Sequence, residues 1–200
     1  MGTRNLTIVH KNGEYKVAQY GQWDGYPEGL GATLLNFLKN VNMDSFRNAI
    51  DNVSFYTQEE LEEIDKQIDE IRKDIPNYEW QRYYPHLSRD CGGDILNRIV
   101  FKGVDKVKNS INFAADSLFC EWAYVIDLDT NKFEVYKGFN KEELSSDERF
   151  YCMEEKCDKE NDIQKNYHPI KFVKSYGLNN LPDEKIFILE LTPPDDEDEE

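Results

Sequence analysis

A glycine-rich segment at residues 21–31, GQWDGYPEGLG, carries the side chains in this sequence best placed to bind a ligand. Glycine and proline shape such a segment into a loop, and loops carry function more often than cores do. A helix is expected to begin after this segment, and its free amides would suit an anion. The alternative interpretation is that the two aromatic residues pack on the end of a sheet. The candidate binding residues are Gln22, Trp23, Asp24, Tyr26 and Glu28.

The first residues, MGTRNLTIV, suggest a second candidate site. A strand begins at the N-terminus, turns at an Asn-Gly pair and returns into the glycine-rich loop. This opening resembles that of the N-terminal-nucleophile hydrolases, including proteasome-type subunits. In that family the side chain of the first residue attacks a carbonyl while its own amino group acts as the base. The resemblance implies Thr3 as nucleophile, exposed by removal of Met1 and Gly2, with Arg4 beside it. The alternative is that Thr3 and Arg4 simply begin a strand.

Three sequence blocks occur in a fixed order: GTRNLT, YKVAQYGQWDGYPEGLG and EWAYVIDLDTNKFEVYKGF. In this order of blocks the chain resembles an uncharacterised family of bacterial, phage and fungal proteins. The resemblance implies that two hairpins and the glycine-rich loop belong to one structural unit. It implies no activity, and it leaves a phage or prophage origin open.

Cysteine and histidine residues offer only a loose match to a zinc site. Cys152 and Cys157 are followed by His168, but a convincing second pair of ligands is missing. The other two histidines, His10 and His86, are far apart in the sequence. We therefore expect no metal and no cofactor, and the absence of a glycine-rich phosphate loop argues against a nucleotide enzyme.

The turn of the second predicted hairpin, after its first strand, superficially resembles a calcium-binding loop. Asp127, Asp129 and Asn131 occupy its first three ligand positions. Lys132 replaces the glycine that such a loop requires, and Gly138 stands where the bidentate acid belongs. A tight hairpin turn explains this pattern better than a calcium site.

The charge of the chain points to the class of partner. The formal net charge is −16, of which six charges come from the acidic run at 195–200, so the rest of the chain carries −10. Such a field repels nucleic acids and anionic membranes and favours basic partners. The alternative is that the charge only keeps the protein soluble. Four cysteines in 200 residues, with no signal peptide or apolar run long enough to span a membrane, predict a protein of the reducing cytoplasm.

Hydrophobic periodicity and turn residues predict the elements. The clearest helix begins at the capping box of Thr57 and Glu60 and ends before Pro76. Its apolar stripe should dock on the body or on a neighbouring helix, with a coiled-coil dimer as the alternative. Three other helices are expected: one that begins near Ala32, one over 44–51 and one over 94–101. A capped helical turn is expected at Asn140. The expected strands are 4–10, 14–20, 118–127, 132–136, KFVKSY at 171–176 and KIFILEL at 185–191.

These elements predict an α+β fold with a mainly antiparallel sheet and packed helices. The resemblance to N-terminal-nucleophile hydrolases implies layers like those of that family. We expect a single domain over 1–192 and a disordered acidic tail over 193–200. The predicted function is a non-enzymatic interaction protein that engages a basic partner. An amide hydrolase that uses Thr3 after processing is the alternative.

Overall fold

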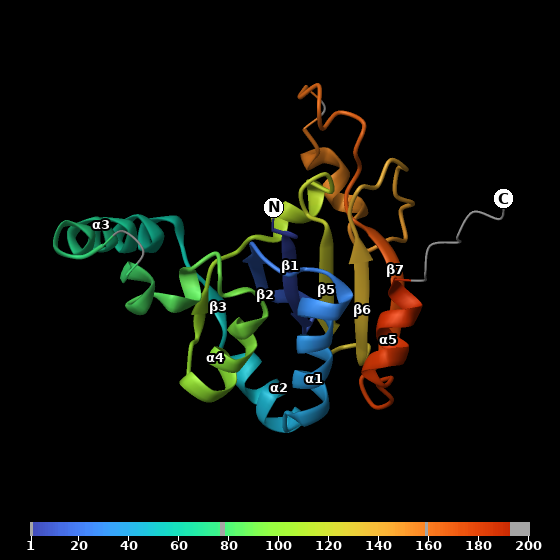
Figure 1. Ribbon diagram of the computed structural model, residues 1–200, viewed down its shortest axis with the longest axis horizontal. Coiled ribbons are helices and arrows are strands. Elements are labelled where there is room, and N and C mark those ends of the chain that lie inside the picture. The colour runs from blue at the N-terminus through green and yellow to red at the C-terminus, as the bar shows by residue number, and fades with distance from the viewer. Residues whose placement is uncertain (1, 77–78, 159, 193–200) are drawn as a thin grey trace.

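The computed structural model describes residues 2–76, 79–158 and 160–192. The predicted tail at 193–200 lies outside the described residues. A five-stranded sheet in the order β2-β1-β5-β6-β7 forms the centre of the molecule (Figure 1). Only the β1–β5 pair is parallel; the other pairs are antiparallel. The predicted α+β class with a mainly antiparallel sheet is confirmed.

Both predicted hairpins form, because their turns contain residues that tolerate a left-handed backbone. Asn12 and Gly13 have φ of 57° and 75°, and Asn131 has φ of 55°. All six residues of β5 are buried, which confirms it as a central strand. The strands are β1 Asn5–Lys11, β2 Glu14–Gly21, β5 Trp122–Asp127, β6 Lys132–Lys137 and β7 Lys171–Gly177.

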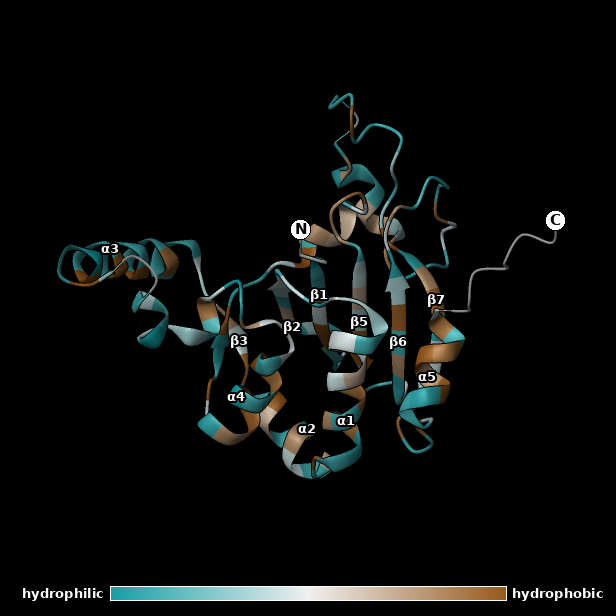
Figure 2. Ribbon diagram, viewed as in Figure 1, coloured by the Kyte–Doolittle hydropathy of each residue, from teal (hydrophilic) through white to brown (hydrophobic). Residues whose placement is uncertain are grey.

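Helices cover one face of the sheet (Figures 1 and 2). Their apolar residues pack on Val9, Tyr124, Ile126 and Phe133 of the strands. The helices are α1 Ala32–Asn40, α2 Met43–Asp51, α4 Ile95–Lys102 and α5 Glu184–Leu191. A π-helical turn, Pro27–Gly31, precedes α1, and a 3-10 turn, Gly92–Asp94, precedes α4.

Short 3-10 segments and loops cover the opposite face, where a second core surrounds Leu6, Ile8, Val125 and Tyr136. The segments are Ile111–Ala115 and Tyr151–Lys156. The sheet therefore lies between a layer of helices and a layer of 3-10 segments and loops. Sheet-on-sheet layering of the N-terminal-nucleophile type is not seen among the described residues.

Helix α3, Gln58–Asp74, projects from one side of the molecule (Figure 1). The predicted capping box is present: Thr57 accepts from the Glu60 amide, and the Glu60 carboxylate accepts from the Thr57 amide. The base of α3 is joined to the sheet by a two-stranded parallel pair, β3 Ser54–Phe55 and β4 Lys106–Val107. Two further 3-10 turns, Glu79–Arg82 and Pro85–Leu87, follow α3.

Two predicted elements were wrong. KIFILEL forms the helix α5 instead of a strand, because Phe187 and Leu191, four residues apart, both face the core. Phe187 stacks on Phe133 at 5.9 Å, and burying such a side chain stabilises the fold by about 1.5–3 kcal/mol. No helix begins at Asn140. Its side chain accepts from the Glu142 amide and donates to the Pro169 carbonyl, which forms a turn.

Among the described residues, no helix combines the length and the apolar character needed to cross a bilayer. The sheet includes strands from both ends of the described chain, between Asn5 and Gly177; the single domain expected over 1–192 stays a prediction.

Candidate functional site

The glycine-rich loop is held to the end of the sheet by its backbone. Asn5 donates to the Trp23 carbonyl at 2.9 Å, and the buried Tyr124 hydroxyl donates to the Gly25 carbonyl at 2.9 Å. A Cβ atom on Gly25 would lie 2.7 Å from the Thr3 carbonyl oxygen, so only glycine fits there. The prediction that this loop forms one unit with the hairpins therefore has a clear physical basis.

The predicted binding side chains of this loop do not converge on one point. Trp23 is 50% exposed and donates from Nε1 to Asp90 at 2.7 Å. Asp24 and Tyr26 contact each other, since Asp24 accepts from the Tyr26 hydroxyl at 3.4 Å, whereas Gln22 accepts from Tyr20 at 2.6 Å and Glu28 accepts from Thr192 at 3.4 Å. Their role in binding stays a prediction.

The prediction that the start of α1 offers free amides to an anion is wrong. The amides of Gly29 and Gly31 donate to the Tyr26 carbonyl, and the Leu30 amide donates to the Asp24 carbonyl at 2.7 Å. The π-helical turn thus uses these donors internally. It does not offer them to an anion.

Thr3 lies two residues before β1 and is partly buried. Its carbonyl accepts from the Gly25 amide at 3.0 Å. The Arg4 guanidinium does not contact Thr3 in the hydrogen-bond network; it lies 4.2 Å from the ring centroid of Phe119. No observation tests Thr3 as a nucleophile, which stays a prediction.

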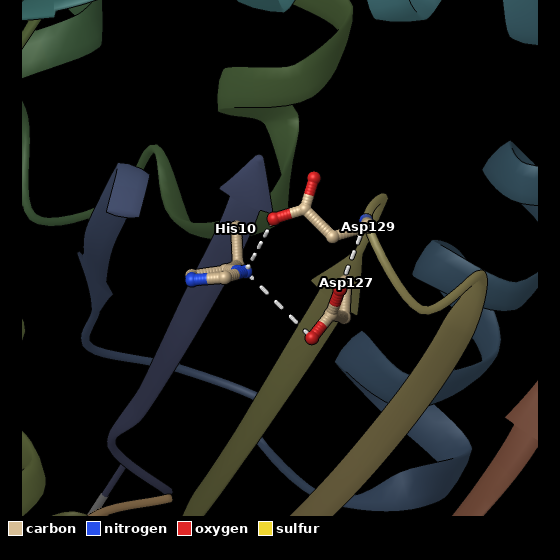
Figure 3. A group of neighbouring side chains, drawn as sticks. All are labelled: His10, Asp127 and Asp129. Atoms are coloured by element: carbon tan, nitrogen blue, oxygen red, sulfur yellow. Dashed lines mark hydrogen bonds and ion pairs between the residues drawn. The ribbon is translucent and has the colours of Figure 1, made fainter. Parts of the chain in front are cut away.

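A cluster of charged side chains lies where the two hairpin turns meet, at the carboxyl ends of β1 and β5 (Figure 3). The Nδ1 atom of His10 is 3.3 Å from Asp129 and 3.7 Å from Asp127. Asp129 accepts from the amides of Asn12 and Gly13, so it fixes the first hairpin turn from the second. Asp127 accepts from the Asp129 and Thr130 amides, which confirms the tight-turn interpretation.

Arg149 neutralises the buried side of this cluster. Its guanidinium contacts Asp127, which is 2% exposed, and donates to Glu134 at 2.9 Å. Burial alone would raise the pKa of Asp127, but the Thr130 amide and Arg149 hold it below its ordinary value. Because this network joins two hairpins and a distant loop, it stabilises the fold at this end of the sheet.

The three residues in Figure 3 offer one metal-ligand atom each, all within 4.8 Å of one another. The rest of the network does not suit a divalent ion, because the ion would compete with the Arg149 guanidinium for Asp127. Among the described residues, Cys152, Cys157 and His168 form no such group. His168 instead contacts Glu154 at 2.8 Å.

A cleft of about 820 Å³ lies beside this cluster, between the sheet and the segment 147–149. Its two cations already have partners: Arg149 contacts Asp127 and Glu134, and Lys171 contacts Glu142. The cleft is lined by the rings of Tyr15, Tyr136 and Phe172 and by the acids Glu134, Asp147 and Glu148. Aromatic faces and acids suit a cationic group. Burial raises the pKa of both phenols, so neither is a base near neutral pH.

Two of the four cysteines are poorly suited to nucleophilic chemistry. Burial raises the pKa of Cys91 to about 11, and it raises that of the fully buried Cys120 well above the ordinary thiol value. Thiols with such values are protonated near neutral pH. Neither Cys91 nor Cys120 is therefore a candidate nucleophile.

Acidic residues, which the charge of the chain led us to expect on the surface, are concentrated on α3. This helix contains eight acidic and three basic residues, a formal charge of −5 in 17 residues. The basic residues are already paired along the helix: Lys66 with Glu63, Arg72 with Asp69, and Lys73 with Glu70. Among the described residues, no cation lies within 4.0 Å of the exposed acids Glu59, Glu62, Asp65 and Asp74.

The apolar stripe of α3 is only partly covered. Ile68 is 5% exposed and is the one fully buried side chain described on the helix. The helix docks on the segment that follows it, where Arg72 lies 5.5 Å from the Trp80 ring and Tyr84 donates to Gln67 at 2.5 Å. The predicted docking is thus made with a 3-10 segment. The remaining stripe residues, Leu61, Ile64, Ile71 and Ile75, are half-buried.

Comparison with known proteins gives no assignment: no family model, no curated protein and no solved structure matches this chain. The function has to be argued from the geometry above.

Proposed function

We propose that this protein is a non-enzymatic interaction protein that binds a basic partner protein through helix α3. The observation that carries the proposal is the projection of α3 from the body with a formal charge of −5 and with four exposed acids that, among the described residues, have no cation within 4.0 Å (Figure 1). Charge of one sign on a projecting element steers an oppositely charged partner and raises the association rate.

The half-buried apolar stripe of α3 supports the same proposal. Purely electrostatic contacts between exposed charges are weak, with each pair contributing about 0–1 kcal/mol. An amphipathic helix adds apolar contacts, and Ile64 and Ile71 lie within reach of a partner that packs along the helix. The partner we propose therefore has a basic surface with an apolar centre.

Affinity capture with charge-reversed variants tests this proposal. The variant Glu62→Lys with Asp65→Lys changes two exposed acids of α3, and Glu143→Lys with Glu155→Lys makes the same charge change away from α3. We expect basic proteins to be retained by the wild type and the control but not by the α3 variant. Raising the salt from about 0.05 M to about 0.5 M should release them, because screening shortens the range of exposed charges. Partners that bind the α3 variant equally well would refute the proposal.

The alternative function is amide hydrolysis by Thr3 as an N-terminal nucleophile. It is supported by the position of Thr3 two residues before β1, where its carbonyl accepts from the Gly25 amide of the glycine-rich loop. The intact mass of the protein purified from its natural source decides between the two. A chain that starts at Met1 or Gly2 has no free Thr3 amino group and cannot perform this chemistry.

A further inference from the structure

A cavity of about 590 Å³ lies along the outer edge of β2, which is an edge strand of the sheet. Two backbone hydrogen bonds join other segments to this edge. The Ser110 amide donates to the Ala18 carbonyl at 2.9 Å, and the Gln22 amide donates to the Arg89 carbonyl at 3.0 Å. Residues of β2 and of the segments 87–89 and 108–116 line the space, which we call the edge cavity. Its volume is typical of a small-molecule site.

One wall of the edge cavity is apolar and accessible. Tyr20 pairs with Leu6 of β1, so its ring lies on the face of the sheet that carries the second core. The Phe113 ring packs against the same core and meets the Tyr20 ring edge to face, with centroids 5.1 Å apart. Both rings, and Leu87 in the same lining, are only half-buried. Their remaining surface is available to the apolar part of a ligand.

In the described part of the chain, two exposed cations of the lining have no hydrogen-bonded carboxylate. The side chain of Arg89 is 65% exposed, and its Nε atom lies 4.0 Å from the Asp90 carboxylate, which is too far for a hydrogen bond. Arg89 also lies near the Tyr20 hydroxyl, because burial raises the pKa of Tyr20 and the charges of Arg4 and Arg89 partly offset that rise. No described carboxylate oxygen lies within 4.0 Å of the exposed Lys108 ammonium. Both cations are therefore available to an anionic group.

The other polar groups of the lining offer little to a cationic ligand. Asp116 is the only acid among the described residues that line the edge cavity, and its Oδ1 atom is buried. Burial also raises the pKa of Asp116. Gln19 is 4% exposed and, because side chains alternate along a strand, it lies on the opposite face of β2 from Tyr20. Two exposed cations against one partly buried acid favour an anion in this cavity.

We propose that the edge cavity binds a small organic monocarboxylate with an aromatic or branched aliphatic body. The carboxylate contacts the Arg89 guanidinium and the Lys108 ammonium. The apolar body packs on Tyr20, Phe113 and Leu87. A carboxylate of this kind suits the site better than inorganic phosphate, because phosphate has no apolar part to cover the rings. This site is separate from α3 and does not depend on the proposed binding of a basic partner.

Isothermal titration of the full chain at fixed ionic strength tests this inference with defined probes. 3-Phenylpropionate carries both the carboxylate and the ring, 3-phenylpropanamide replaces the carboxylate with a neutral amide, and propionate lacks the ring. We expect the amide and propionate each to bind at least about tenfold more weakly than 3-phenylpropionate. The amide loses the charge-assisted hydrogen bonds to the two cations, and propionate loses the apolar contact.

Variants make the test specific to the edge cavity. Arg89→Gln and Lys108→Met should each weaken binding of 3-phenylpropionate by about tenfold and leave binding of the amide unchanged. Lys102→Met removes an exposed cation outside the lining and is the matched control, which should bind as the wild type does. Because all three side chains are exposed, we expect the variants to keep the wild-type melting temperature.

Four outcomes would overturn the proposal. They are no binding of 3-phenylpropionate at about 10 mM, equal binding of the acid and its amide, unchanged binding to the Arg89 variant, and tighter binding of inorganic phosphate than of 3-phenylpropionate. An equal loss of binding in the Lys102 control would also contradict it, since the carboxylate would then respond to the overall charge of the protein and not to the cations of the edge cavity.

Discussion

The guanidinium of Arg149 contacts the carboxylate of Asp127, which is 2% exposed at the carboxyl end of the central strand. Glu134 accepts from the same guanidinium on the neighbouring strand. The guanidinium of one arginine from a distant loop therefore contacts two carboxylates that are buried on the sheet.

Removing this cation should be strongly destabilising. We expect Arg149→Met to lower the free energy of unfolding by about 3–5 kcal/mol, because it leaves buried carboxylates uncompensated. Urea denaturation at neutral pH measures this loss. Arg82→Met, which changes a surface arginine paired with Glu79, should alter stability by less than about 0.5 kcal/mol. A loss below about 1 kcal/mol for Arg149→Met would contradict the structural role assigned to it.

The acids of Figure 3 should make stability depend on pH. The pKa of Asp129 is held below its ordinary value, first by the Gly13 and Asn12 amides, and that of Asp127 is also lowered. A lowered folded-state pKa contributes stability that is present above the unfolded value of about 3.9 and is lost as the pH falls through the folded value. Asp129→Asn should therefore flatten the fall in unfolding free energy below about pH 4. An Asp129→Asn variant that keeps the wild-type slope below about pH 4 would count against this assignment.

The glycine-rich loop should tolerate no side chain at Gly25. An added Cβ would lie 2.7 Å from the Thr3 carbonyl oxygen and 2.8 Å from Asn5. We expect Gly25→Ala to lower the melting temperature and to cost about 1–3 kcal/mol. Gly177→Ala is the matched control, since nothing lies within 4 Å of its added Cβ. Equal stability of the two variants would show that the loop is not held against the sheet as described.

Phe139 adopts a left-handed backbone with φ of 56°, which a bulky side chain rarely does. Its ring is 49% exposed, so little packing offsets the strain. Phe139→Asn should raise the free energy of unfolding by about 0.5–1 kcal/mol, because asparagine tolerates this conformation, as Asn12 and Asn131 do here. Phe101→Asn removes an exposed ring, 64% accessible, from within helix α4 and should give no gain. Thermal unfolding distinguishes the two, and a destabilised Phe139→Asn would mean that the ring makes an unrecognised contact.

Local signals in the sequence determined much of this structure. The Asn12-Gly13 turn sets the first hairpin, and the Thr57–Glu60 capping box starts α3, because each depends on residues within a few positions of one another. The net charge, which requires no structure, favours a basic partner, and that partner stays a prediction. The apolar run KIFILEL was ambiguous, since a short buried run fits strand and helix equally until its contacts are known.

Only the tertiary structure decided which distant residues meet. Parallel pairing of β1 with β5 places His10 opposite Asp127, 117 positions away in the chain, and no local pattern encodes that pairing. The outer edge of β2 likewise meets a distant part of the chain, because Ala18 pairs with Asn109, 91 positions later, which composition cannot reveal. Turns and caps are stabilised by neighbours in the sequence, whereas a site is formed by packing, which depends on the whole chain.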